Sequence, residues 1–82
     1  MNISYSRKAV KQIEALDRTA KQRIRKAIEK LPKGDVKPLT GSDGLYRLRI
    51  GGWRVVFSYP AKGNVLIEKI APRGKAYKGG LP

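Results

Sequence analysis

The first part of the chain spaces its apolar residues as an α-helix does. Ser6, a favoured N-cap, precedes one run of such residues, and Asp17, another favoured N-cap, precedes a second run that stops before Pro32 and Gly34. The apolar positions are Ala9, Val10, Ile13 and Leu16, followed by Ala20, Ile24, Ala27, Ile28 and Leu31. The other faces of these runs carry Lys8, Lys11, Lys21, Arg25, Lys26 and Lys30. The pattern predicts a helical hairpin with one apolar side and one cationic side.

The second half of the chain changes to a period of two, which is typical of half-buried β-strands. The alternation predicts strands over Leu45–Ile50 and Trp53–Tyr59, joined by a tight turn at the glycine pair between them. A third strand is predicted over Val65–Ala71, although the alternation there does not show which of its sides faces the core. Ile3–Tyr5 suits a short opening strand, and the polar stretch Lys33–Gly44 is predicted to be a connecting loop.

These elements follow the order β-α-α-β-β-β and predict an α+β fold in a single domain, residues 1–82. Strands linked by hairpins form an antiparallel sheet, and the apolar side of the helical hairpin must cover one of its faces. The alternation assigns Trp53 to the core side of the sheet. It leaves Arg47, Arg49 and Arg54 on the uncovered face.

Charge is the strongest compositional signal, with 19 Lys and Arg against 6 Asp and Glu and a net charge of +13. Such an excess favours nucleic acid, an anionic membrane surface or an acidic protein as partner, and nucleic acid fits best. A basic surface that serves only solubility is the alternative. The chain has no Cys and no His, which removes disulfides, thiolate metal sites and histidine-dependent hydrolysis. We expect a cytoplasmic protein with no membrane span, metal or cofactor.

The predicted hairpin concentrates arginine on the open face of the sheet. Arg47 and Arg49 lie ~6–7 Å apart along one strand, and Arg54 lies across the turn on the next. Arginine offers a planar fork that matches phosphate oxygens, and clustered cations repel one another unless an anion binds between them. No acidic cross-strand partner is evident in the sequence. The pattern therefore favours phosphate binding over a merely solvated face.

Several segments together resemble the RelE/ParE toxin superfamily, and its RelE-type members in particular. LYRLRI (residues 45–50) and GWRVVF (52–57) resemble the family's central hairpin, and KIAPRGKAY (69–77) resembles its C-terminal segment. GDVKPL (34–39) and YSRKA (5–9) fit the loop before the hairpin and the first helix. The resemblance spans almost the whole chain, and it is specific through the order and spacing of its parts.

The resemblance implies a metal-independent endoribonuclease that cuts mRNA on the ribosome. The ribose 2′-hydroxyl would attack the adjacent phosphate and leave a 2′,3′-cyclic phosphate. By position, the implied catalytic residues are Arg47, Arg49, Arg54, Arg73 and Tyr77. The basic pair of the first hairpin strand is two lysines in some relatives, and arginine is a poor general base because its pKa lies above ~12.

Phosphate binding is therefore the expected role of Arg47 and Arg49, together with Lys75 and Lys78 of the C-terminal segment. Tyr77 or Lys75 would then handle protons, and Tyr77 could instead stack on a base or anchor the tail.

The expected partners are the ribosome, mRNA and an acidic RelB-like antitoxin, drawn to the basic surface by its charge. Three other functions stay open. A ParE-like toxin would inhibit DNA gyrase, a plain RNA- or DNA-binding module would have no activity, and an inactive copy would only bind antitoxin.

Overall fold

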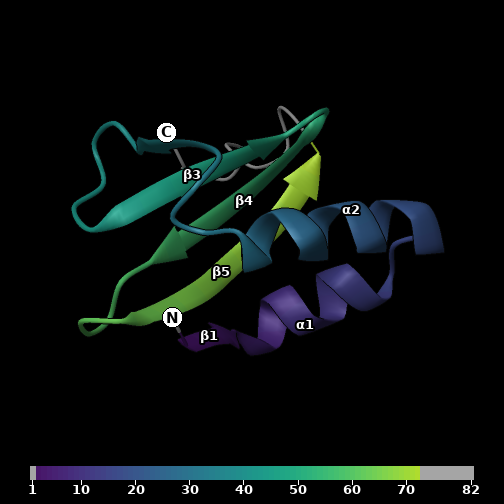
Figure 1. The fold of residues 1–82 in the computed structure, drawn as a ribbon, viewed down its shortest axis with the longest axis horizontal. Helices are drawn as coiled ribbons and strands as arrows, with labels where there is room; N and C mark the ends of the chain where they lie inside the picture. Colours follow the sequence, from purple (N-terminus) through teal and green to yellow (C-terminus); the bar gives the residue numbers. More distant parts are fainter. Residues whose placement is uncertain (1, 73–82) are drawn as a thin grey trace.

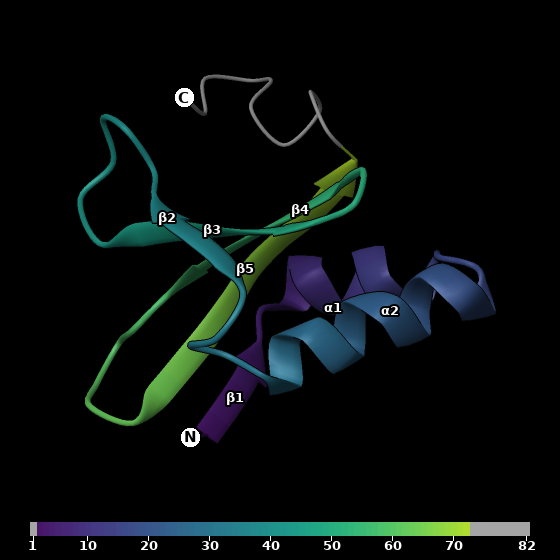
Figure 2. The same ribbon diagram turned by 45° about the horizontal axis from the view of Figure 1, so that its top comes forward.

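The computed structural model describes residues 2–72 as a sheet packed against a helical hairpin (Figure 1). The elements are β1 (Asn2–Tyr5), α1 (Arg7–Glu14), α2 (Arg18–Glu29), β2 (Asp35–Pro38), β3 (Leu45–Ile50), β4 (Trp53–Ser58) and β5 (Asn64–Pro72). Both helices lie against the same face of the sheet (Figure 2). The expected α+β fold with one covered face is confirmed.

The sheet has five strands in the order β1-β5-β4-β3-β2. The ladders β2–β3, β3–β4 and β4–β5 are antiparallel, as expected for strands joined by hairpins. β1 pairs with β5 in parallel, so the sheet is mixed. The two helices connect β1 at one edge of the sheet to β2 at the other edge. The prediction that residues 33–44 form only a loop is wrong, since β2 lies within them.

β2 forms the edge of the sheet beyond β3. Just after β2, the Leu39 amide donates to the Leu45 carbonyl at 3.0 Å. Because alternate residues of a strand direct their backbone groups to the same side, Asp35 and Lys37 of β2 also direct theirs toward β3. The outward positions are Val36, whose amide turns back to the Gly34 carbonyl at 3.0 Å, and Pro38, which has no N–H. β2 thus offers no free amide donor on its outer edge, which protects the edge against pairing with another chain.

Both predicted helix caps are present. The Ser6 side chain accepts from the Ala9 amide at 3.0 Å, and the Asp17 carboxylate accepts from the Ala20 amide at 2.8 Å. The Ser6 hydroxyl also donates to the Glu68 carbonyl at 2.8 Å, beyond the point where β1 leaves β5. One side chain therefore begins α1 and ties it to the sheet.

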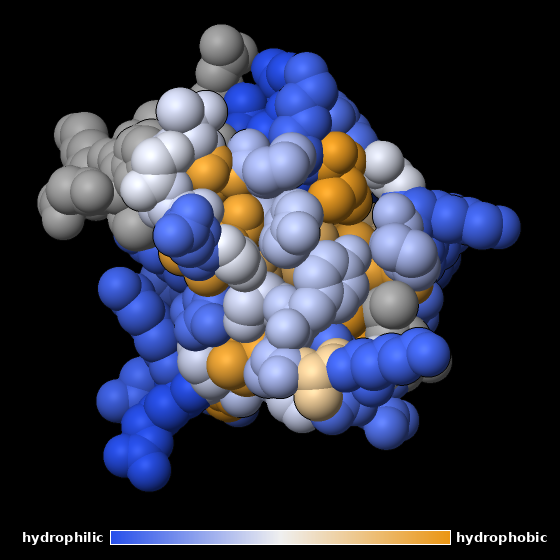
Figure 3. Space-filling view, turned by 90° about the vertical axis from the view of Figure 1, so that its left-hand side faces the viewer, coloured by the Kyte–Doolittle hydropathy of each residue, from blue (hydrophilic) through white to orange (hydrophobic). Residues whose placement is uncertain are grey.

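The core lies between the helices and the covered face of the sheet. Its largest fully buried side chains are Phe57, Ile24, Ile28, Leu48, Ile67, Val55 and Val65. Trp53 packs against this cluster and is partly buried, as the alternation predicted. At the end of the sheet, Phe57 lies 5.7 Å from Tyr46 and 5.5 Å from Tyr59 between ring centroids. Seen from the left-hand side of Figure 1, hydrophobic surface gathers between hydrophilic side chains (Figure 3).

The exposed edge of β5 beyond β1 is completed by a side chain of α1. The Ile70 amide donates to the Gln12 side-chain oxygen at 2.7 Å, where a sixth strand would otherwise be needed. Replacing Gln12 by Leu should lower the free energy of unfolding by about 1–3 kcal/mol, because the partly buried amide loses its acceptor. Urea denaturation measures the loss. Gln22→Leu, at an exposed position of α2, is the matched control and should change stability by no more than ~0.5 kcal/mol.

Candidate phosphate-binding face

The strand register brings the three hairpin arginines onto one face of the sheet. Arg49 lies directly opposite Arg54 across the β3–β4 ladder, and Arg47 precedes Arg49 by two residues on β3. Residues opposite each other have Cβ atoms ~5 Å apart, and alternate residues of one strand point to the same side. The core residue Leu48 lies between the two β3 arginines and points to the helices. The arginine face is therefore the one that the helices leave uncovered.

Arg47 has an acidic partner that the sequence did not reveal. Its Nη1 lies 3.3 Å from an Asp35 carboxylate oxygen and donates to the Asp35 carbonyl at 3.0 Å. The Arg47 side chain is 14% exposed and that of Asp35 is 49% exposed. The expectation that no carboxylate faces the arginines is therefore wrong, because Asp35 belongs to a strand rather than to a loop. Asp35 holds the Arg47 guanidinium against β2.

Arg54 is the buried member of the group, at only 6% exposed. Its Nη1 donates to the Trp53 carbonyl at 3.3 Å, whereas its Nε has no hydrogen-bond partner within residues 2–72. Its cross-strand neighbours are Arg49 and Ala71, so neither of them is an acid. A buried cation without a counter-ion is costly, and a bound anion would lower that cost. The sequence placed Arg54 on this face but could not show its burial.

Lys69 adds a further cation to the same face. It lies opposite Val56, which is itself opposite Arg47. A register shift between Val56 and Phe57 interrupts the alternation of β5, so its residues before and after the shift point to different sides than simple alternation predicts. This shift explains why simple alternation left the side of β5 open. Burial lowers the pKa of Lys69 from its usual value, and the nearby charge of Lys8 lowers it further. A lysine with a lowered pKa gives up its proton more readily than an ordinary lysine.

The C-terminal candidates Arg73, Lys75, Tyr77 and Lys78 lie outside the described residues, so their expected roles stay predictions. In the described chain no helix is long and apolar enough to cross a membrane.

Removing the Asp35 charge should strengthen anion binding at this face. Asp35→Asn releases the Arg47 guanidinium and takes a negative charge away from an approaching phosphate, so single-stranded RNA should bind severalfold more tightly. Stability should fall by less than about 1 kcal/mol, because the Asp35 carboxylate is half-exposed. Fluorescence anisotropy with labelled RNA at constant salt measures the affinity. Asp43→Asn makes the same charge change in the exposed loop before β3 and should leave the affinity nearly unchanged.

Comparison with known proteins gives a consistent result. The family described as "ParE toxin of type II toxin-antitoxin system, parDE" matches residues 3–77. RelE1 of Methanocaldococcus jannaschii, named as a toxin, is 32% identical over 85 residues, 94% of each chain. RelE in a RelE-RelB complex from Pyrococcus horikoshii is similar at 31% identity and a TM-score of 0.69, over 90% of this chain and 96% of that one. The isolated E. coli RelE toxin shares the fold, with a TM-score of 0.70 at 18% identity over 93% and 89% of the two chains.

Proposed function

We propose that this chain, which belongs to the RelE/ParE toxin superfamily, is a ribosome-dependent endoribonuclease that cuts mRNA. The observation that carries the proposal is Arg54, a buried cation whose Nε has no partner in the described part of the chain and which lies opposite another arginine. Such an arrangement suits a bound phosphate, whose negative charge would attract both guanidinium groups.

The proposed reaction is transfer of the phosphoryl group within the RNA strand. The 2′-oxygen forms a bond to phosphorus as the bond to the 5′-oxygen breaks, giving a 2′,3′-cyclic phosphate and a free 5′-hydroxyl. Negative charge grows on the phosphoryl oxygens in the transition state. Arg54, joined by Arg73, would stabilise that charge, and preorganised cations are usually the largest contribution to such catalysis. Arg47 and Arg49 would hold the substrate phosphate, assisted by Lys75 and Lys78.

Two protons must move during this step, one from the 2′-hydroxyl and one to the leaving 5′-oxygen. Tyr77 or Lys75 would handle them, because the guanidinium groups stay protonated. Tyr77→Phe should then lower the rate of cleavage by about 10²–10⁴-fold with RNA binding retained. Single-turnover cleavage on programmed ribosomes measures the rate, with Tyr59→Phe as control. Undiminished cleavage by Tyr77→Phe would remove this residue from proton transfer.

The proposed partner that restrains the toxin is an acidic RelB-like antitoxin. The relative from Pyrococcus horikoshii, at 31% identity, is described in a RelE-RelB complex. A net charge of +13 also favours association with an acidic chain through electrostatic steering.

A second candidate function is inhibition of DNA gyrase, because the matching family is described as ParE toxin. The experiment that separates the two is induction of the protein in cells, followed by mapping of new mRNA 5′ ends and measurement of plasmid supercoiling. New ends within translated mRNA with early translation arrest support the nuclease. Altered supercoiling with intact mRNA would instead identify a gyrase inhibitor, and neither change would point to a binding module or an inactive copy.

A further inference from the structure

An open hollow of about 370 Å³ lies at the end of α1, beside the final residues of β5. Trp53, Leu16 and Ala71 give it apolar walls, and Gln12 and Lys69 are the residues with polar side chains that line it. Among the described residues that border the hollow none is acidic. Its size lies at the lower end of the range for small-ligand sites, roughly 300–1,000 Å³.

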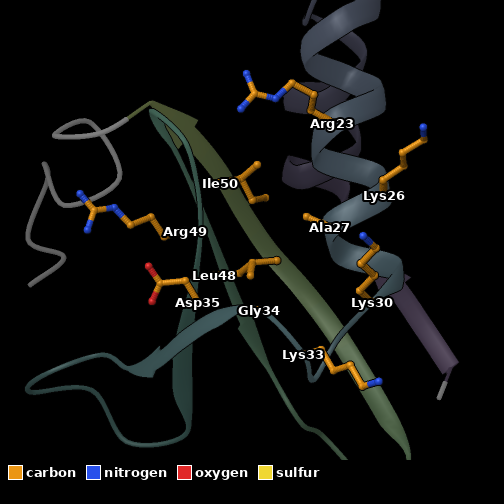
Figure 4. A pocket seen from close by; sticks show the side chains of 10 residues that line it. All are labelled: Arg23, Lys26, Ala27, Lys30, Lys33, Gly34, Asp35, Leu48, Arg49 and Ile50. Atoms are coloured by element: carbon orange, nitrogen blue, oxygen red, sulfur yellow. The ribbon is translucent and has the colours of Figure 1, made fainter.

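Trp53 gives this hollow a planar aromatic surface. It is the only tryptophan of the chain and is half-buried. The core cluster packs against its ring, and the same residue lines the hollow, so the indole is held in place while part of it stays accessible. Trp53 lies opposite Ile50 across the hairpin, and Ile50 points toward α2 whereas Arg49 points away from it (Figure 4). A base that stacks on this ring would therefore lie on the helix side of the sheet.

The polar side chains of the hollow are hydrogen-bond donors. The side-chain oxygen of Gln12 accepts from the Ile70 amide at 2.7 Å, which leaves the NH₂ group with its two N–H donors. Within residues 2–72 no group accepts a hydrogen bond from this NH₂. Lys69 is also a donor, because an ammonium group has no lone pair to offer. These side chains match a ligand whose edge consists of acceptors.

We infer that this hollow binds an unpaired nucleobase whose edge presents hydrogen-bond acceptors, with its ring on Trp53 and its edge toward the Gln12 NH₂ group. Guanine fits best, because its O6 and N7 are neighbouring acceptors, whereas adenine places an amino donor beside N7. The net charge of +13 attracts the phosphate that such a base carries.

The hollow adjoins the arginine face of the sheet. Lys69 lines the hollow and adds a cation to that face, and Ala71 of the hollow wall lies directly opposite Arg54. An RNA strand that follows Lys69 would reach from a phosphate at the arginines to a base in the hollow. The inference rests on the proposed function for RNA as the ligand, and it makes Gln12 and Trp53 specificity-determining residues for a base near the cleaved bond.

The test uses the full chain with guanosine 5′-monophosphate, adenosine 5′-monophosphate and ribose 5-phosphate, which carries no base. None of these probes has a bond between nucleotides, so binding is measured apart from cleavage. NMR follows the Trp53 indole N–H and the Gln12 NH₂, and a single tryptophan makes the indole signal unambiguous. The guanosine nucleotide should shift both signals to saturation and bind at least about fivefold more tightly than the adenosine nucleotide. Ribose 5-phosphate should shift neither signal.

Matched variants separate recognition of the base from attraction by charge. Gln12→Glu keeps an oxygen for the Ile70 amide but replaces the NH₂ donors by a second acceptor. It should weaken binding of the guanosine nucleotide by about tenfold or more and remove the preference over adenosine. Gln22→Glu makes the same charge change at an exposed position of α2 and should alter the affinity by about twofold or less.

Two substitutions test the stacking surface. Trp53→Leu should abolish binding, as followed at the Gln12 NH₂, whereas Trp53→Phe keeps an aromatic ring and should retain most of the affinity. Circular dichroism verifies that each variant is folded. If Trp53→Leu is unfolded, the comparison of Gln12→Glu with Gln22→Glu decides the question.

Equal shifts of the Trp53 signal with the guanosine nucleotide and with ribose 5-phosphate would overturn the inference. A preference for adenosine, or equal losses in Gln12→Glu and Gln22→Glu, would overturn it as well. Absence of nucleotide binding in a protein that still cuts mRNA would refute the base site and leave the nuclease proposal standing. Saturable guanosine binding in a protein that cuts no mRNA would refute the nuclease proposal and support the base site.

Discussion

Replacing Arg54 by Gln is expected to lower the rate of mRNA cleavage by about 10²–10³-fold, with the fold intact. The loss follows from the position of the guanidinium, which is 6% exposed and opposite Arg49, where the charge of a phosphate would be held. Single-turnover cleavage of mRNA on programmed ribosomes measures the rate. Growth arrest on induction should disappear in parallel.

The same substitution should leave stability unchanged or raise it. Within residues 2–72 no acidic side chain pairs with Arg54, and a buried cation without a counter-ion costs free energy. Gln removes the charge while it keeps an amide group that can donate to the Trp53 carbonyl. This opposite behaviour of activity and stability separates a catalytic role from a structural one.

Two further variants make the test of Arg54 specific. Arg54→Lys keeps the charge but loses the planar fork, so it should recover only a small part of the activity. Arg18→Gln removes the same charge from an exposed position of α2 and should leave cleavage within about threefold of the unchanged protein. Cleavage by Arg54→Gln at nearly the original rate would remove Arg54 from the reaction. Unfolding of that variant would show instead that the charge supports the structure.

Phe57→Ala should cause the largest loss of stability, about 3–5 kcal/mol. Phe57 is fully buried near the C-terminal end of β4 and packs against Tyr46 and Tyr59, with ring centroids 5.7 and 5.5 Å away. A domain of this size has only ~5–10 kcal/mol of stability in total, so the variant should be partly unfolded at 37 °C. Urea denaturation at 25 °C measures the difference.

Tyr59→Ala is the matched control for Phe57→Ala. Tyr59 belongs to the same aromatic group but is 37% exposed, so its removal should cost about 1 kcal/mol or less. Equal losses in the two variants would show that the ring contacts, rather than the burial of Phe57, set the stability of this part of the sheet.

The sequence predicts which face of the sheet carries the candidate site, but not the contacts and the burial of its side chains. Alternation along the two hairpin strands assigns Arg47, Arg49 and Arg54 to one side, because a strand directs successive side chains to opposite faces. The ion pair between Arg47 and Asp35 could not be predicted, since a segment with glycine and proline has the composition of a loop. The burial of Arg54 also depends on how the finished structure closes around it.

The sequence by itself determined the local elements: the helices with their Ser6 and Asp17 caps, the central hairpin and the excess of positive charge. These depend on spacings of two to four residues and on composition, which any short window of the chain contains. The tertiary structure alone decided the pairing of β2, the contact of Gln12 with Ile70, 58 residues away, and the hollow beside Trp53. Such features arise because backbone groups and apolar surface left over by the local elements must find partners elsewhere in the chain, and only the assembled fold determines which partners lie within reach.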